Sequence, residues 1–232
     1  MKSKCLKTDK IEFSTKSELV YKTLKDQIIT GQLKPGRRFS ASELAVELGV
    51  SRTPVNDAVR LLADQGLIRM LPNKGFEIKS LSWTEIEEVM HIRLQLEKLA
   101  VTWAINRASA EKIKELVHLS GLMRKAVLEH NKRDYYLNNN LFHNTLYKAA
   151  RAPRLFDLHQ RIWVYEGWYV AQLDGLSERL LLLCDDHDEI ISAMLKENTS
   201  KAHQVIERHV QNCLQIISEN LRAAGYQYNF NA

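Results

Sequence analysis

Three histidines in the second half of the chain are spaced so that they can meet. His143 follows Asn139 by four residues, which places both side chains on one helical face, about one turn apart. His187 and His209 lie in two further helical segments, on faces that otherwise carry apolar residues. If these segments run antiparallel about a turn at 198–199, His187 lies level with His209. The pattern predicts three imidazoles and one amide oxygen around a divalent metal ion such as zinc, nickel or manganese. The alternative is that each histidine is a hydrogen-bonded core residue.

One pair of opposite charges lies in an apolar stripe earlier in this half. Arg93 precedes Glu97 by four residues, and Val89 and Ala100 share their face of the helix. The pair is therefore expected to be buried or to line a cavity. Arg93 can bind the carboxylate of a small organic acid through two parallel hydrogen bonds. The alternative interpretation is a structural salt bridge, because buried charges usually occur in pairs.

A second group of polar residues, in the first third of the chain, has the chemistry to bind DNA. Arginine can donate two hydrogen bonds to guanine, asparagine can pair with adenine, and hydroxyls can reach phosphates or bases. Arg52, Asn56, Ser51 and Thr53 fall at the N-terminal end of one expected helix. Lys74 falls at a predicted hairpin tip, and Arg37 and Arg38 precede another helix.

The elements that must position this group form a recognisable order. Apolar spacing predicts a helix over 17–30, and Ser40 and Glu43 have the spacing of a capping box at the start of a second helix. Gly49 permits a tight turn before a third helix, which Ser51 can cap. Two short alternating strands around a glycine-containing turn follow, over 67–79. Three helices and a hairpin are typical of a winged helix-turn-helix.

The rest of the chain has helical periodicity and no strand-like alternation. A second capping box joins Ser82 and Glu85, and the helical segments start near Ser82, Ser109, Asn131, Pro153, Ser177 and Thr199. The predicted fold is therefore mainly α, with an N-terminal winged helix-turn-helix carrying a small β-hairpin and an all-helical bundle after it. We expect a tail at 1–16, a DNA-binding domain at 17–80, a helical effector and metal domain at 81–225, and a tail at 226–232.

The charge is distributed unevenly along the chain. The whole sequence has a formal net charge of +5. Residues 1–80 hold 15 Lys and Arg against 9 Asp and Glu, a net charge of +6, and the remaining residues hold 18 against 19, a net charge of −1. The positive excess thus belongs to the first third, which favours a polyanionic partner for that part.

Cysteine content and hydropathy indicate a cytoplasmic protein without membrane segments. Cys5, Cys184 and Cys213 are too few and too far apart for a disulfide framework. We expect reduced thiols, with Cys184 and Cys213 facing each other as small core residues; a redox or metal role is the alternative. No apolar run is long enough for a membrane helix or a signal peptide.

Residues 17–80 closely resemble the GntR family of transcription regulators. The residues that carry the resemblance are Leu33-Lys34-Pro35-Gly36, Leu44-Ala45 with Leu48-Gly49-Val50-Ser51-Arg52-Thr53-Pro54-Val55, Gly66-Leu67-Ile68 and Asn73-Lys74-Gly75-Phe76. The resemblance implies binding to a double-stranded operator as a homodimer. Many relatives have arginine where this chain has Asn56, so the operator is expected to differ from the common one.

The helical half resembles the FCD domain of FadR-like regulators. Arg93 and Glu97, the segment from Asn139 to His143, and His187 and His209 carry this resemblance. In that family one acidic residue and three histidines bind a metal, which often helps to hold a carboxylate effector. Asn139 stands where the acidic residue is usual, so a neutral ligand replaces a charged one.

The same residues also allow other functions. A metal-dependent hydrolase could use His143, His187 and His209 with an activated water, but no motif supplies a general base and the winged helix goes unexplained. The helical half could serve only for dimerisation, and the winged helix could serve only for protein contacts. The interpretation favoured by the sequence is a DNA-binding regulator, a repressor rather than an enzyme, that responds to a small organic acid.

Overall fold

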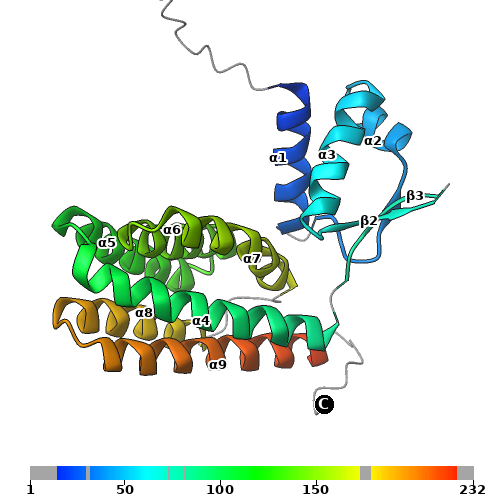
Figure 1. Cartoon of the computed structure of the whole chain (residues 1–232). Coiled ribbons are helices and arrows are strands. Elements are labelled where there is room, and N and C mark those ends of the chain that lie inside the picture. The colour runs from blue at the N-terminus through cyan, green and yellow to red at the C-terminus, as the bar shows by residue number, and fades with distance from the viewer. Residues whose placement is uncertain (1–14, 30–31, 73, 81, 173–178, 224–232) are drawn as a thin grey trace, which may run out of the picture. The chain divides into compact units, whose positions relative to one another are not determined.

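The computed structural model describes residues 15–29, 32–72, 74–80, 82–172 and 179–223. The chain divides into two compact units, one formed by Met1–Asp26 and Pro35–Lys79 and the other by Gln27–Lys34 and Ser80–Ala232. Residues 1–14 and 226–232 of the two expected tails lie outside the described residues. Figure 1 shows the helices and strands of each unit.

The first unit builds three helices on an apolar core. They are α1 (Lys16–Ile29), of which Gln27–Ile29 are assigned to the second unit, α2 (Ala41–Glu47) and α3 (Arg52–Asp64). The expected stripes are buried, with Leu24, Leu44 and Val59 at most 2% exposed. A hydrogen bond also joins α1 to α3, because the Ser17 hydroxyl donates to Asp57 over 3.2 Å. Apolar burial on this scale is the main source of stability for so small a unit.

The helix starts follow the sequence prediction, with one difference. Ser40 and Glu43 form the predicted capping box, in which the Ser40 hydroxyl accepts from the Glu43 amide and the Glu43 carboxylate accepts from the Ser40 amide. Gly49 has φ +64°, as a tight turn requires. Ser51 occupies the N-cap position of α3, but its hydroxyl makes no capping hydrogen bond. The prediction that Ser51 caps α3 was therefore wrong, and its side chain is exposed to solvent.

The sheet of this unit has three strands where the sequence predicted two. The expected hairpin is present as β2 (Ile68–Leu71) and β3 (Gly75–Ile78), and β1 (Arg38–Phe39) adds to the other edge of β3. All pairs are antiparallel, and Glu77 on the central strand lies opposite both Arg38 and Arg69. A two-residue strand carries no periodicity, so it cannot be recognised from sequence.

Glu77 holds the three strands together on one side. Its carboxylate accepts from Arg38 Nε over 2.7 Å and also from Arg69 Nη2. The side chain of Glu77 is 8% exposed, whereas the two arginine side chains are 66% and 63% exposed. The two guanidinium groups hold the pKa of Glu77 below its ordinary value.

The second unit is a bundle of six helices within the described residues. They are α4 (Trp83–Arg107), α5 (Ala110–Leu128), α6 (Lys132–Ala149), α7 (Pro153–Gln172), α8 (Arg179–Leu195) and α9 (Thr199–Ala223). The capping box predicted at Ser82 and Glu85 starts α4. Ser109 and Asn131 cap α5 and α6. The expected start near Ser177 lies outside the described residues, and α8 begins at Arg179.

The core of the bundle lies between α4 and the other helices. α4 packs on α6, α7, α8 and α9, and α5 packs on both α6 and α8.

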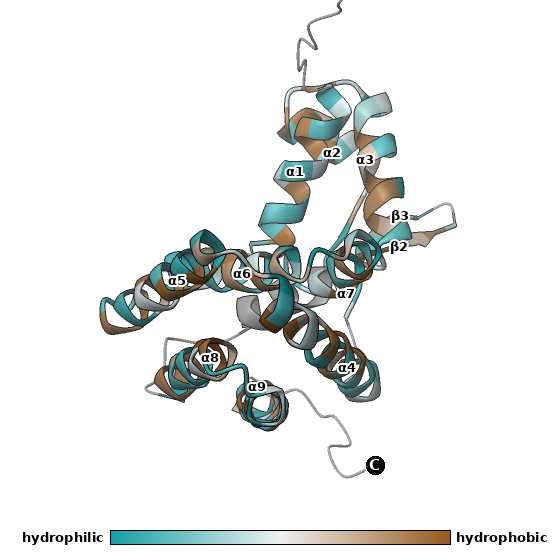
Figure 2. Ribbon diagram, turned by 60° about the vertical axis from the view of Figure 1, so that its left-hand side comes forward, coloured by the Kyte–Doolittle hydropathy of each residue, from teal (hydrophilic) through white to brown (hydrophobic). Residues whose placement is uncertain are grey.

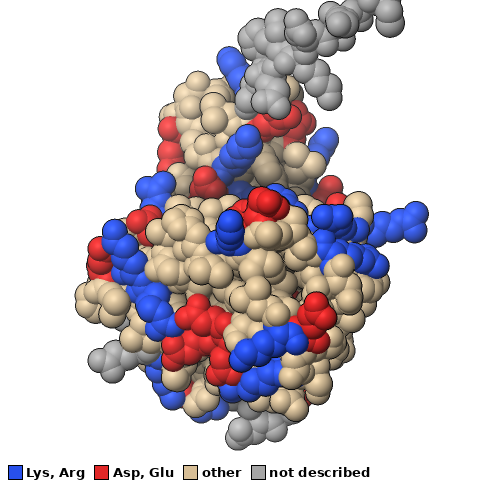
Figure 3. Space-filling model, turned by 90° about the vertical axis from the view of Figure 1, so that its left-hand side faces the viewer, with Lys and Arg blue, Asp and Glu red and all other residues tan. Residues whose placement is uncertain are grey.

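Each helix carries apolar and polar stretches side by side, as Figure 2 shows. Acidic and basic side chains lie close together on the face drawn in Figure 3, in keeping with the near-zero charge of this half. None of the described helices is long and apolar enough to cross a membrane. The predicted fold class, mainly α with a winged helix-turn-helix and a helical bundle, is confirmed.

Gly75 should tolerate alanine less well than Gly49 does. Both have positive φ, +83° and +64°, which costs alanine about 1–2 kcal/mol. A methyl group at Gly75 would also meet the backbone oxygen of Phe39, whereas at Gly49 nothing lies within 4 Å. Equilibrium unfolding in urea should therefore show a larger loss of unfolding free energy for Gly75→Ala. If Gly75→Ala and Gly49→Ala lose the same unfolding free energy, the close approach of β1 and β3 is contradicted.

The contribution of Glu77 to stability should depend on pH. Because the folded-state pKa lies below the ordinary value of 4.5, the stabilisation is present above that pH and is lost as the pH falls through the lowered folded-state pKa. The difference in unfolding free energy between the wild type and Glu77→Gln should be constant near neutral pH and shrink below about pH 4.5. Urea unfolding at a series of pH values measures it. A difference that does not change with pH would show that the charge of Glu77 is not involved.

Candidate DNA-binding surface and candidate metal centre

The N-terminal end of α3 presents polar side chains on the surface. Ser51, Arg52 and Thr53 are exposed, and Asn56 is half-buried, while Pro54 and Val55 pack inward. This division follows from helical spacing, since apolar positions turn toward α1 and α2. The four polar residues predicted to contact DNA thus lie together at one end of one helix.

The other predicted DNA contacts are exposed as well, but two of them have partners. Arg37 lies 3.9 Å from a carboxylate oxygen of Glu47, which is a loose surface contact. Arg38 lies on β1 rather than in a loop, and its guanidinium binds Glu77. Lys74 is exposed beside the turn between β2 and β3. Arg38 can therefore reach a phosphate only by sharing its donors with Glu77.

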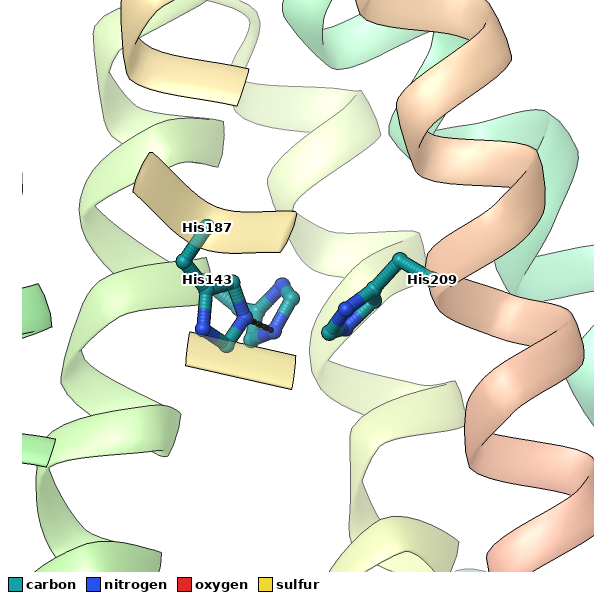
Figure 4. Close-up of side chains that lie close together, drawn as sticks. All are labelled: His143, His187 and His209. Carbon is teal, nitrogen blue, oxygen red and sulfur yellow. Dashed lines mark hydrogen bonds between the residues drawn. The ribbon is translucent and has the colours of Figure 1, made fainter. Parts of the chain in front are cut away.

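Three helices of the second unit bring the three histidines to one point. His143 comes from the middle of α6, His187 from α8 and His209 from α9 (Figure 4). Each imidazole is at most 1% exposed. The ring centroids of His187 and His209 lie 4.6 Å apart, which confirms that these residues are level on antiparallel helices. One nitrogen from each of the three rings lies within 4.8 Å of the others.

The spacing of the nitrogens fits a shared metal ion. His143 Nε2 and His187 Nε2 are 3.2 Å apart. Two nitrogens bound to one zinc ion at about 2.0–2.1 Å in tetrahedral geometry lie about 3.3–3.4 Å apart. Burial lowers the pKa of His143 to about 4 and that of His187 well below its ordinary value. Both rings are therefore neutral near pH 7, the form that binds metals.

Carboxylates orient two of the three imidazoles. A Glu97 oxygen lies 3.0 Å from His143 Nδ1, and an Asp186 oxygen lies 3.6 Å from His209 Nδ1. A carboxylate beside Nδ1 favours the tautomer that carries the proton there and leaves Nε2 as the ligand atom, although neither Nδ1 makes a hydrogen bond to a described residue in this geometry. Against the effect of burial, Cys213 and Asp186 raise the pKa of His209 to about 10, which would leave the ring protonated near pH 7. The contact with Arg93 points the other way: a guanidinium only donates hydrogen bonds, so His209 Nε2, 3.3 Å from Arg93 Nη2, must accept, and this contact requires a neutral ring.

The charged pair predicted on α4 lies in the same centre. Arg93 Nε donates to Glu97 over 2.7 Å, and the two side chains are 3% and 0% exposed. Burial alone would raise the pKa of Glu97, but the guanidinium of Arg93 and the nearby imidazoles hold it well below the usual range. The two side chains form a buried salt bridge, and their position beside the histidines is also compatible with binding an effector.

Sequence reasoning missed three residues around this centre. Trp163 on α7 packs against His143 with 4.6 Å between ring centroids, and Arg93 lies over the Trp163 ring at 5.0 Å. His159 stacks on Tyr147, and burial lowers its pKa to about 3. Asp186 accepts from Arg208 and Asn212 as well as facing His209. The antiparallel register of α8 and α9 could have indicated Asp186; nothing in the sequence indicated Trp163.

Asn139, Cys184 and Cys213 are the remaining residues that the sequence singled out in this unit. Asn139 is buried one turn before His143, and its role as an oxygen ligand stays a prediction. Cys184 and Cys213 are both buried and not in a disulfide. Burial raises the pKa of Cys184 to about 12, so it remains a thiol at neutral pH. Cys213 Sγ lies 3.8 Å from His209 Nε2.

Several polar atoms of the centre have no hydrogen-bond partner in the described part of the chain. Among the described residues, Glu97 Oε2, His187 Nδ1 and Trp163 Nε1 are buried and make no hydrogen bond. Buried polar atoms usually have partners, so unsatisfied ones beside converging imidazoles fit a site that holds an ion or a ligand.

Two family profiles cover most of the chain. The profile of "Bacterial regulatory proteins, gntR family" matches residues 16–78, and that of the FCD domain matches residues 88–212. The chain belongs to the GntR family. It is a DNA-binding transcription regulator and not an enzyme, so the hydrolase interpretation of its histidines is set aside.

Relatives and solved structures agree with this assignment. The GntR-family chain is 31% identical over 199 residues to the uncharacterised HTH-type regulator YdhC of Bacillus subtilis, covering 82% of this chain and 85% of YdhC. It is 25% identical over 230 residues to the HTH-type regulator McbR of Escherichia coli, covering 96% and 98%. The solved structure of E. coli McbR/YncC shares its fold, with a TM-score of 0.78 and 23% identity over 88% of this chain and 98% of that one.

Proposed function

We propose that this GntR-family regulator is a repressor that binds operator DNA as a homodimer and responds to a small carboxylate and a divalent metal ion. The observation that carries the proposal is the buried convergence of three imidazole nitrogens within 4.8 Å beside the Arg93–Glu97 pair. Several curated relatives are named repressors, among them GlaR of E. coli. The proposed place of action is the cytoplasm, where bacterial operators lie.

The α3 end is the proposed reading surface. Arg52 and Asn56 are the residues best suited to base edges, and Ser51 and Thr53 to phosphates or bases. Lys74 supplies a phosphate or minor-groove contact, and Arg37 and Arg38 add positive charge beside α2. One such surface covers one half-site, which is why a pseudo-palindromic operator and a homodimer are proposed together.

His143, His187 and His209 would hold the metal through Nε2, with the Asn139 amide oxygen as a fourth ligand. A bound divalent ion supplies positive charge for an anionic effector. Asn139 is neutral, so the ion would keep more of its charge than beside an aspartate, and an effector carboxylate would be the natural counter-charge. Arg93 would bind the same effector through its fork of N–H donors.

If Arg52 contacts a base and Lys74 contacts the DNA backbone, their alanine variants should change DNA binding in different ways. Arg52→Ala should weaken operator binding by about 1–3 kcal/mol and relax the preference at one base position. Lys74→Ala should lower affinity evenly across sequences and reduce its salt dependence. Fluorescence anisotropy with a selected operator and its single-base variants measures both. Full specificity in Arg52→Ala would remove this residue from base recognition.

Metal binding predicts about one equivalent of zinc, nickel or manganese per chain. Replacing His143 by alanine should lower metal affinity by more than the roughly 10–100-fold typical of losing a partner that only orients a ligand. His91, which is exposed on α4, provides the matched control. Affinity is measured by competition with a chromophoric chelator. If purified chain takes up no metal at neutral pH and its melting temperature does not change, the metal part of the proposal is wrong.

Effector control predicts reciprocal coupling between two ligands. A carboxylate found in a thermal-shift screen of mono-, di- and tricarboxylates should bind with different affinity in the presence of operator DNA, by about 1–3 kcal/mol. Calorimetric titrations with and without operator measure this. Arg93→Ala should weaken effector binding, whereas Arg124→Ala, on the outside of α5, should not. Identical titrations would show that the sites are uncoupled.

A further inference from the structure

The guanidinium of Arg93 contacts the very nitrogens that a metal ion would need. Its Nη2 lies 3.2 Å from His143 Nε2 and 3.3 Å from His209 Nε2. A neutral imidazole has one lone pair in the ring plane, on the nitrogen without the proton. A lone pair that accepts a hydrogen bond from Arg93 is not available to coordinate a metal ion. The two contacts therefore exclude coordination by His143 and His209 at the same time.

The surroundings hold Arg93 in this position. Glu97 accepts from Nε over 2.7 Å, and the ring of Trp163 lies 5.0 Å from the guanidinium carbon. Carboxylates beside Nδ1 of His143 and of His209 turn both Nε2 atoms toward the guanidinium. Because arginine stays charged under all ordinary conditions, the guanidinium is a resident cation beside His143 and His209.

We infer that Arg93 and the divalent metal ion compete for Nε2 of His143 and His209, so that metal uptake releases the Arg93 Nη groups for an effector carboxylate. This inference rests on the proposed metal site and concerns its regulation. Without metal, Arg93 satisfies the imidazoles and is held by them. With metal, charge repulsion and the loss of two acceptors move the guanidinium away, while Nε can keep its bond to Glu97. Effector binding then becomes dependent on metal.

Two variants separate this competition from simple repulsion. Arg93→Gln removes the guanidinium and one positive charge. The double variant Arg93→Met with Glu97→Gln removes both charges of the pair, so its net charge equals that of the wild type, and it leaves no unpaired buried charge to unfold the bundle. The amide oxygen introduced by Glu97→Gln can accept from His143 Nδ1, so the orientation of that ring is kept. Arg124→Gln is the control for losing a surface guanidinium, which binds Asp185 and Asp188 in the wild type. Circular dichroism checks that each full-length chain is folded.

Zinc affinity is measured for every chain by competition with a chromophoric chelator. Both Arg93 variants should bind zinc more tightly than the wild type, by about 10–100-fold if removing a competitor has an effect as large as, and opposite in sign to, the loss of a group that orients a ligand. Arg124→Gln should match the wild type. If the double variant binds zinc as tightly as the wild type or more weakly, the competition is overturned. This holds even if Arg93→Gln binds zinc more tightly, because losing one positive charge then explains the whole effect.

The same titrations distinguish the two proposals from one another. If the wild type binds no zinc but both Arg93 variants do, the competition is supported and the metal part of the proposed function fails. If no chain binds zinc, cobalt or nickel, both proposals fail. If all chains bind equally, the metal site stands and the competition is overturned.

Discussion

The helical unit depends on how the buried charge of Arg93 is balanced. Its side chain is 3% exposed, and an uncompensated charge at such depth costs several kcal/mol. Glu97 supplies the counter-charge one turn later on the same helix, and the imidazoles of α6 and α9 supply acceptors for Arg93 Nη2. Three features of the unit are compatible with the buried guanidinium of Arg93. They are the orientation of α4 in the bundle, the protonation of the histidines and the position of Trp163.

Much of this arrangement follows from helix geometry and could be predicted. Apolar spacing located the helices, and the fixed rise along two antiparallel helices placed His187 level with His209. The same spacing placed Arg93 and Glu97 on one buried face. In the first unit, alternation and glycine positions located the hairpin, and the capping boxes at Ser40 and Ser82 located two helix starts. These are local or nearly local properties of the chain.

The features that could not be predicted depend on contacts between distant segments. Arg93 meets His143 and His209 across 50 and 116 residues, and no spacing rule fixes such a pair. β1 exists only because β3 offers it an edge. The free hydroxyl of Ser51 shows the opposite case, in which a residue with the right local chemistry for a cap does not use it. The roles of the exposed residues on α3 lie beyond both kinds of reasoning, because they depend on a partner molecule.

The shared histidine centre also determines how the bundle can open. His143, His187 and His209 belong to three different helices, yet each one packs its ring against the other two. If α8 or α9 detached alone, the imidazoles left behind would lose their neighbours while still shielded from water. Partial opening is therefore disfavoured relative to opening of α6, α8 and α9 together, and the three helices should behave as one cooperative unit in amide hydrogen exchange. The histidine centre thus couples three helices into a single dynamic element.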